Sequence, residues 1–117
     1  MIIDDDRGFL DELGETLKLS GYEMVAVQDV GVVLDVATKT KPDIILIDLK
    51  MPKKTGFQLA GELRHSPQLR QIPVIAMTGV FKNGYDPLMN ACGIKKYLKK
   101  PFTPLDVIAA IEEAIEH

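Results

Sequence analysis

Hydrophobic positions along the chain follow two spacings that take turns from one end to the other. Short apolar or β-branched runs predict five strands, at 1–3, 22–27, 44–47, 72–77 and 95–99. Between these runs, apolar residues recur every three or four positions, which is the spacing of an amphipathic helix. Helices are therefore expected at about 7–19, 30–39, 55–65, 87–92 and 104–115. The predicted order is strand then helix, five times over.

Glycines and capping residues support several of these boundaries. Gly21 and Gly93 follow the first and fourth predicted helices, and glycine commonly ends a helix. Asp86-Pro87 combines an N-cap residue with proline at the first helical position. Strict alternation of strands and helices predicts an α/β fold, with a parallel sheet, right-handed crossovers and helices on both faces. The all-apolar run 44–47 fits a strand covered on both faces.

The overall composition restricts the class of protein. With 117 residues, 46% apolar and 26% charged, the chain has the size and balance of one soluble domain. The formal net charge of −3 argues against general nucleic-acid binding, and no apolar run approaches the roughly 18 residues of a membrane span. Cys92 is the one cysteine, so no internal disulfide can form. We expect a cytoplasmic protein that contacts neither nucleic acid nor membrane directly.

Polar side chains with chemical potential come just after four of the predicted strands. They are Asp4, Asp5 and Asp6 after the first strand, Asp48 after the third, Thr78 after the fourth and Lys100 after the fifth. In a parallel sheet the carboxyl ends of the strands share one edge, and ligands bind there. We therefore expect these groups to gather at one site.

The gathered side chains suit a phosphoryl group. Neighbouring carboxylates repel one another and raise each other's pKa, and a hard cation such as Mg²⁺ with oxygen ligands relieves that repulsion. Lys100 adds a positive charge and Thr78 adds a hydroxyl donor, both of which bind phosphoryl oxygens. A carboxylate such as Asp48 can itself attack phosphorus and form an acyl phosphate. Taken alone, Asp4 and Asp5 are better explained as a solvated turn, because acids favour such positions.

Four segments in order carry a resemblance to a known family. They read IIDDD at 2–6, IDLKMPKKTG at 47–56, IAMTG at 75–79 and YLKKPF at 97–102. Asp48 precedes Thr78 by 30 residues, and Thr78 precedes Lys100 by 22. In these segments and spacings the chain resembles the receiver domain of two-component response regulators. The resemblance covers essentially the whole sequence, so residues 1–117 are expected to form one receiver domain.

The resemblance implies both a fold and a function. The fold is a flavodoxin-like (βα)5 three-layer sandwich, whose parallel five-stranded sheet has the strand order 2-1-3-4-5. The function is that of a phosphoryl-accepting signalling module rather than an enzyme. Asp48 would take phosphate from a sensor histidine kinase or a histidine phosphotransfer protein. The signal would pass to an output domain or target protein, from a monomer or a phosphorylation-dependent homodimer.

The resemblance also assigns roles to individual residues. Mg²⁺ would be held by Asp5, Asp48 and the backbone carbonyl of Lys50, with Asp4 acting through water. Thr78 and Lys100 would bind the phosphoryl oxygens, and the Lys100-Pro101 bond would be cis. Thr78 and Tyr97 would switch the face formed by the fourth helix, the fifth strand and the fifth helix. Tyr97, judged without the resemblance, is more typical of a half-buried strand residue.

Two further residue patterns add expectations. Gly56 is expected to let the backbone pass from the loop after Asp48 into the next helix without a Cβ clash. Seven lysines make the site edge locally basic: Lys50, Lys53, Lys54, Lys95, Lys96, Lys99 and Lys100. A solvated face is the first interpretation of these lysines, and attraction of an acidic partner or of the phosphodonor is the second.

Other classes of protein remain as alternatives. A receiver-like interaction module that works without phosphorylation would be expected to lack one of the acids, Thr78 or Lys100, and all are present. A Mg²⁺-dependent aspartyl phosphatase would carry a second acid two residues after the nucleophile, where Lys50 stands. A flavin- or dinucleotide-binding domain would follow its first strand with a glycine-rich loop, and here the residues are DDD.

Overall fold

A computed structural model describes residues 1–80, 82, 84–94 and 96–116. Its elements alternate strictly between strand and helix, apart from one short 3-10 turn. They are β1 (Ile2–Ile3), α1 (Arg7–Leu19), β2 (Ala26–Val27), η1 (Val30–Val32), α2 (Val33–Thr40), β3 (Ile45–Asp48), α3 (Gly56–Arg64), β4 (Val74–Thr78), α4 (Tyr85–Ala91), β5 (Lys96–Lys99) and α5 (Pro104–Glu116). Lys95, the first residue of the last predicted strand, lies outside the described residues.

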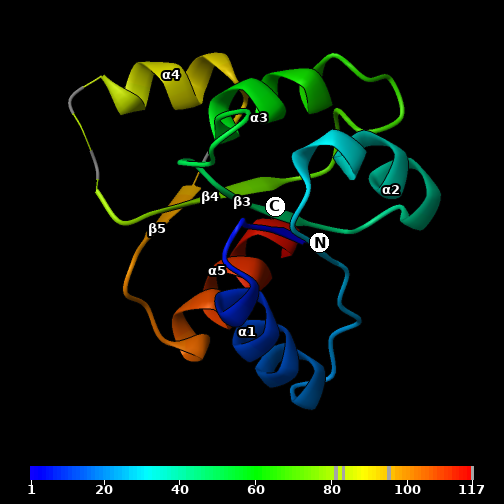
Figure 1. Cartoon of the computed structure of the whole chain (residues 1–117), viewed down its shortest axis with the longest axis vertical. Helices are drawn as coiled ribbons and strands as arrows, with labels where there is room; N and C mark the ends of the chain where they lie inside the picture. The colour runs from blue at the N-terminus through cyan, green and yellow to red at the C-terminus, as the bar shows by residue number, and fades with distance from the viewer. Residues whose placement is uncertain (81, 83, 95, 117) are drawn as a thin grey trace.

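The five strands form one parallel sheet in the order β2-β1-β3-β4-β5. Helices α2, α3 and α4 cover one face of this sheet, and α1 and α5 cover the other (Figure 1). This arrangement is a flavodoxin-like three-layer sandwich, and it confirms both the predicted fold class and the strand order. The order reverses between β1 and β3, so the carboxyl ends of these two strands mark the point where ligands bind in open α/β sheets.

The central strand β3 is buried on both faces. Ile45 and Ile47 pack into the cluster beneath α2, α3 and α4, whereas Ile44 and Leu46 pack toward α1 and α5. All four side chains are at most 8% exposed. Alternate side chains of a strand point to opposite faces, so a run of four apolar residues serves both halves of the core. The chain that leads to Asp48 is thus held on both sides.

Local signals at the helix ends follow the expected chemistry. The Asp6 carboxylate accepts a hydrogen bond from the Phe9 N–H at 3.1 Å and caps α1. Thr55 and Gln58 form a reciprocal capping box at the start of α3. Gly21 and Gly93 follow α1 and α4 with φ of 95° and 78°, a left-handed backbone that favours glycine. The helix ends predicted from these two glycines are confirmed.

Several predicted boundaries were wrong in detail. The predicted strand 22–27 is only two residues long, and these pair with Ile2 and Ile3 of β1. The predicted helix at 30–39 begins as a 3-10 turn and continues to Thr40 as α2. Helix α4 begins at Tyr85 rather than after Asp86. Its N-cap is Gly84 with φ of 91°, and Asp86 lies in the first turn.

Within the part of the chain that the structure describes, no helix is both long enough and apolar enough to pass through a membrane.

Candidate functional site

Strand pairing brings the predicted site residues to one edge of the sheet. Ile3 is paired with Ile47, so Asp4 and Asp48 follow at the same level on neighbouring strands. Asp48 and Thr78 are the last residues of β3 and β4, and not the first residues beyond them as the sequence predicted. Lys100 follows β5 directly, and its N–H donates to the Thr78 carbonyl at 2.7 Å. All four side chains thus start from the carboxyl ends of adjacent strands.

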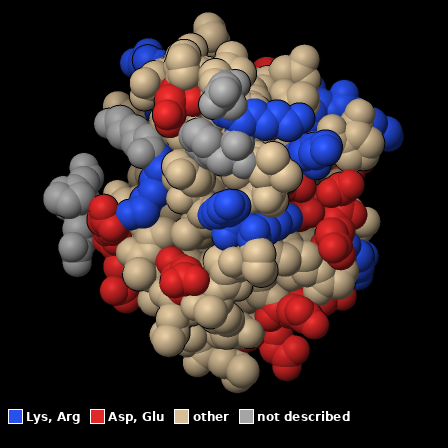
Figure 2. Space-filling model, turned by 90° about the vertical axis from the view of Figure 1, so that its left-hand side faces the viewer, with Lys and Arg blue, Asp and Glu red and all other residues tan. Residues whose placement is uncertain are grey.

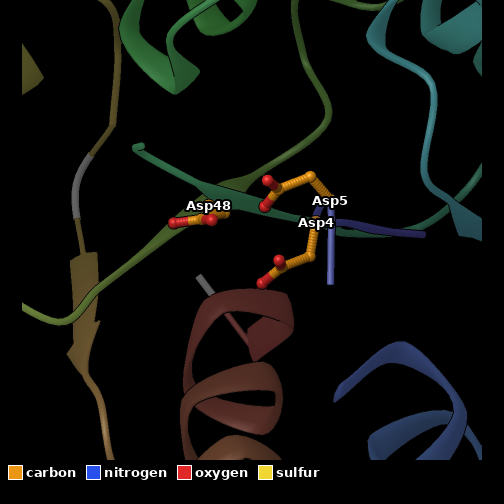
Figure 3. Close-up of side chains that lie close together, drawn as sticks. All are labelled: Asp4, Asp5 and Asp48. Carbon is orange, nitrogen blue, oxygen red and sulfur yellow. The ribbon is translucent and has the colours of Figure 1, made fainter. Parts of the chain in front are cut away.

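Three carboxylates form the centre of the site. One oxygen from each of Asp4, Asp5 and Asp48 lies within 4.8 Å of the others. Figure 3 shows the three side chains together, two from the residues after β1 and one from the end of β3. Asp4 and Asp48 are 1% and 7% exposed, whereas Asp5 is exposed to solvent. The cluster therefore has a buried base and an open side.

Lys100 is tied to this cluster more closely than the sequence indicated. Its ammonium Nζ donates to Asp4 Oδ2 at 2.7 Å and lies 3.9 Å from Asp48 Oδ2. The other Asp4 oxygen, Oδ1, accepts the Asp6 N–H at 3.0 Å. Both Asp4 oxygens are thus already engaged by donors. The water-mediated role of Asp4 toward a metal stays a prediction.

The Asp48 carboxyl has a strongly altered proton affinity. Burial raises its pKa from 3.8 to about 6, and the charges of Asp4 and Asp5 act in the same direction. The Lys50 N–H, which donates to Asp48 Oδ1 at 3.2 Å, and the Lys100 ammonium act against this rise. A positive charge placed beside the carboxyl would act against this rise and favour the ionised form.

The donor set fits a hard divalent cation. The cluster of Asp4, Asp5 and Asp48 offers carboxylate oxygens as ligands, and oxygen ligands suit Mg²⁺. Asp5 is exposed to solvent, whereas Asp48 is buried and its ionisation is disfavoured. A cation between these two would offset the burial and the like charges that raise the Asp48 pKa. The Lys50 backbone lies beside Asp48 through its N–H, and a role for the Lys50 carbonyl stays a prediction.

Gly56 is required by a close approach of the backbone. A Cβ atom built on Gly56 would lie 2.5 Å from the Asp48 carbonyl oxygen and 2.8 Å from the Leu49 Cα. Real Cβ atoms do not make such contacts with backbone, so any larger residue would push β3 and α3 apart. The predicted need for glycine is confirmed, and its cause is the close approach of the backbone at Asp48 and Leu49.

The predicted switch residues occupy distinct environments. The Thr78 hydroxyl donates to the Val80 carbonyl at 2.7 Å and accepts the Val80 N–H at 3.2 Å, so it is engaged within its own loop. Tyr97 lies on edge strand β5 with 41% of its surface exposed. The Lys100-Pro101 peptide bond is cis, as predicted.

The lysines near the site divide into two groups. Lys54, Lys96 and Lys100 are paired with Glu62, Glu113 and Asp4, respectively. Lys50, Lys53 and Lys99 are exposed, and Lys95 lies outside the described residues. The space-filling view onto the β5 side shows basic side chains gathered across the middle of that face, with acidic ones around them (Figure 2).

Sequence reasoning missed one aromatic neighbour of the site. The Lys100 Nζ lies 4.3 Å from the centre of the Phe9 ring, within the range of a cation–π contact. The sequence indicated Phe9 only as an apolar position of the first helix. The pairing of Lys100 with Asp4 was also missed. Both contacts join residues more than 90 positions apart, and a helical or strand period in one sequence contains no signal for such distant pairs.

Comparisons with known proteins agree with this geometry. Residues 1–112 match the family model for the response regulator receiver domain. The polar-differentiation response regulator DivK of Brucella anthropi is 30% identical to this chain over 103 residues. These residues make up 88% of this chain and 84% of DivK.

Solved structures with a similar fold include proteins of the same family. Chemotaxis protein CheY4 of Vibrio cholerae is similar with a TM-score of 0.92 and 26% identity, over 97% of this chain and 94% of that one. The receiver domain of sensor histidine kinase PA1611 from Pseudomonas aeruginosa has a TM-score of 0.84 and 25% identity, over 99% and 96%. Given the sheet order, the acidic cluster and these similarities, the chain belongs to the response regulator receiver domain family.

Proposed function

We propose that this chain is a phosphoryl-accepting signalling module, in which Asp48 takes a phosphoryl group from a sensor histidine kinase or a histidine phosphotransfer protein. The observation that carries the proposal is the position of Asp48. Asp48 is 7% exposed, ends a strand that is buried on both faces, and lies beside two other acids and the Lys100 ammonium. A structural surface acid would need none of these neighbours.

The transfer follows from what each side chain can do. A carboxylate oxygen of Asp48 forms a bond to phosphorus as the bond from phosphorus to the donor's nitrogen or oxygen breaks, and the product is an acyl phosphate. Lys100, 3.9 Å from Asp48, compensates negative charge on the transferred oxygens. Asp4 holds Lys100 at 2.7 Å and so fixes the direction from which that charge acts.

Mg²⁺ is the proposed cofactor of this site. Asp5 and Asp48 would hold it, with Asp4 contributing through water, and the ion would supply additional positive charge for the phosphoryl oxygens. The receiver domain of PA1611, which is similar to this chain, has a magnesium ion coordinated in its active site cleft. The oxygen-only cluster of Asp4, Asp5 and Asp48 supports the same metal here.

The signal is proposed to leave through the face made by α4, β5 and α5. To bind a phosphoryl oxygen, the Thr78 hydroxyl has to give up its hydrogen bond to the Val80 carbonyl. The movement of the β4–α4 loop would then open space toward Tyr97, whose exposed ring could turn inward. Phosphorylation in this scheme biases an existing equilibrium between two packings. The receiver of the signal is an output domain or a separate target protein, met by a monomer or a phosphorylation-dependent homodimer.

The proposed role is that of a signalling partner and not of an enzyme that releases a product. Cys92 is the only cysteine of the chain, and a reducing compartment such as the cytoplasm belongs to the proposal. The receiver-like module that works without phosphorylation is the competing function. It shares the fold, so only chemistry at Asp48 separates the two.

Intact mass spectrometry with acetyl phosphate tests the proposed function. In the presence of Mg²⁺ the wild-type chain should gain the mass of one phosphoryl group, and the Asp48→Asn variant should gain none. Chelation of Mg²⁺ should suppress the gain in the wild type. A wild type that stays unlabelled with Mg²⁺ and donor in excess would favour the interaction module.

A further inference from the structure

The Lys100 ammonium is held from two chemically different sides. On one side is the Asp4 carboxylate, 1% exposed, at 2.7 Å. On the other side is the face of the Phe9 ring, with its centre 4.3 Å from the same nitrogen. The Lys100 side chain retains 27% of its exposure, so its contact with the ring is partly shielded from water. Such contacts are most favourable when the cation is desolvated.

The Phe9 ring is itself fixed by its surroundings. Phe9 lies in the first turn of α1, where its N–H donates to the capping carboxylate of Asp6 at 3.1 Å. Its ring meets Phe102 edge-on, with centres 5.8 Å apart and planes at 78°. Phe102 follows the Lys100-Pro101 pair in the chain. The helix cap and the edge-on contact therefore hold the ring in place beside the ammonium.

A ring face has an advantage over a second acid in this position. A carboxylate beside Lys100 would accept a hydrogen bond from the ammonium and would add a negative charge to a site that already contains three. An aromatic face attracts the cation through its quadrupole but has no strong acceptor and no net charge. The ammonium keeps donors free for phosphoryl oxygens while its position is restricted.

We propose that Phe9 is a positioning residue for phosphoryl transfer, which holds the Lys100 ammonium against Asp4 and close to Asp48 through the face of its ring. This inference rests on the proposed function for its kinetic consequence. The contact between the Phe9 ring and the Lys100 ammonium does not depend on the proposed function and can be measured without phosphorylation.

Proton NMR of Lys100 tests the geometric part. Protons above a ring face shift upfield, so the Lys100 methylene protons next to Nζ should be upfield of ordinary lysine values in the wild type. The shift should disappear in Phe9→Leu and persist in Phe9→Tyr. Phe57→Leu is the matched control, because Phe57 is also half-buried and also meets an aromatic ring edge-on, that of Tyr85. Ordinary wild-type values for Lys100 would overturn the proposal without any variant having to fold.

Phosphorylation kinetics with acetyl phosphate and Mg²⁺ test the catalytic consequence. Phe9→Leu should lower the maximal rate about fivefold, which corresponds to about 1 kcal/mol of a partly desolvated cation–π contact. The donor concentration for half-maximal rate should change little, and Phe9→Tyr should restore the rate. If Phe9→Tyr is as slow as Phe9→Leu, or if Phe9→Leu is as fast as the wild type, the ring face does not position Lys100 for transfer.

The NMR and kinetic experiments together distinguish an error in this inference from an error in the proposed function. A wild type that takes up no phosphoryl group but shows upfield Lys100 protons would refute phosphoryl transfer and leave the ring contact in place. A wild type that is phosphorylated, with Lys100 protons unaffected by Phe9→Leu, would keep the proposed function and remove Phe9 from it.

Discussion

Replacing Asp48 by asparagine should stabilise the metal-free protein at neutral pH, although it removes the proposed nucleophile. Asparagine keeps the shape of the side chain and an oxygen that can accept the Lys50 N–H. It removes a charge that the site disfavours through burial and through Asp4 and Asp5. A carboxylate that lowers the stability of the fold is consistent with the proposed functional role, because functional sites often reduce stability.

The magnitude follows from the Asp48 pKa. A rise from 3.8 to about 6 corresponds to a destabilisation of about 3 kcal/mol for the ionised form in the folded protein. Asp48→Asn removes this destabilisation, but part of the resulting gain in stability is lost, because the buried asparagine amide also needs hydrogen-bond partners. We expect Asp48→Asn to raise the free energy of unfolding by about 2 kcal/mol at pH 7.5. For a domain of this size that is roughly 8 °C in Tm.

The same pKa fixes the pH dependence. Between pH 3.8 and about 6 the folded protein binds more protons at Asp48 than the unfolded chain does. The contribution of Asp48 to the free energy of unfolding therefore falls as pH rises through this window, and the full destabilisation is present above it. The advantage of Asp48→Asn should be largest at pH 7.5 and should shrink as the pH is lowered through 6 toward 4.

Urea denaturation in chelator, followed by circular dichroism at several pH values, measures this effect. Asp11→Asn is the matched control, because Asp11 is an exposed acid on α1 and pairs only with Arg7 at 3.6 Å among the ion pairs of the described residues. Its effect on stability should be small at every pH. An Asp48→Asn variant that is no more stable than the wild type at pH 7.5, or whose advantage does not change with pH, would refute the reasoning.

The remaining predictions concern the supports of the site. Asp5→Asn should weaken Mg²⁺ binding and slow phosphorylation together, as titration followed by NMR and by mass spectrometry would show; unchanged metal affinity would remove Asp5 from the ligand set. Gly56→Ala should destabilise the fold by about 2 kcal/mol or more in urea denaturation, because its Cβ would meet the Asp48 carbonyl at 2.5 Å; an unchanged midpoint would contradict the close approach. Asp6→Ala should lower the free energy of unfolding by about 1 kcal/mol through loss of the α1 cap, and Asp6→Asn, which can still cap, should recover most of it. Lys100→Ala should slow phosphorylation without abolishing it and should weaken the response of β5 amides to beryllofluoride; a full response would exclude Lys100 from the switch.

Much of the fold could be predicted because its signals are local. The all-apolar run that ends at Asp48 predicts a strand buried on both faces, and the period of α1 predicts its length within a residue. Gly21 and Gly93 end helices where a left-handed backbone is needed. The boundaries that were wrong depend on other parts of the chain. β2 pairs with β1 through only two residues, and α4 has Gly84 rather than Asp86 as its N-cap.

The features of the site also divide into those that the sequence predicts and those that depend on distant contacts. The strand-end acids could be predicted, because parallel pairing places every strand end on one edge. The contacts that organise them could not. Lys100 pairs with Asp4 across 96 positions, and Phe9 reaches the same ammonium from the first helix. The Thr78 hydroxyl is hydrogen-bonded to the Val80 carbonyl of its own loop. The spacing of residues in the sequence does not predict this side-chain rotamer. The two contacts of Lys100, with Asp4 and with Phe9, are the ones on which the further inference depends.

Mapping the phosphoryl group to a single residue tests the central claim most directly. The wild-type chain would be treated with acetyl phosphate and Mg²⁺, digested rapidly at a pH that preserves acyl phosphates, and sequenced by tandem mass spectrometry. We expect the label on Asp48, with Asp4, Asp5 and Asp6 unlabelled and with no label in Asp48→Asn. Label on another acid of the wild type, or labelling of Asp48→Asn at the wild-type rate, would contradict the assignment of Asp48 as the phosphoacceptor.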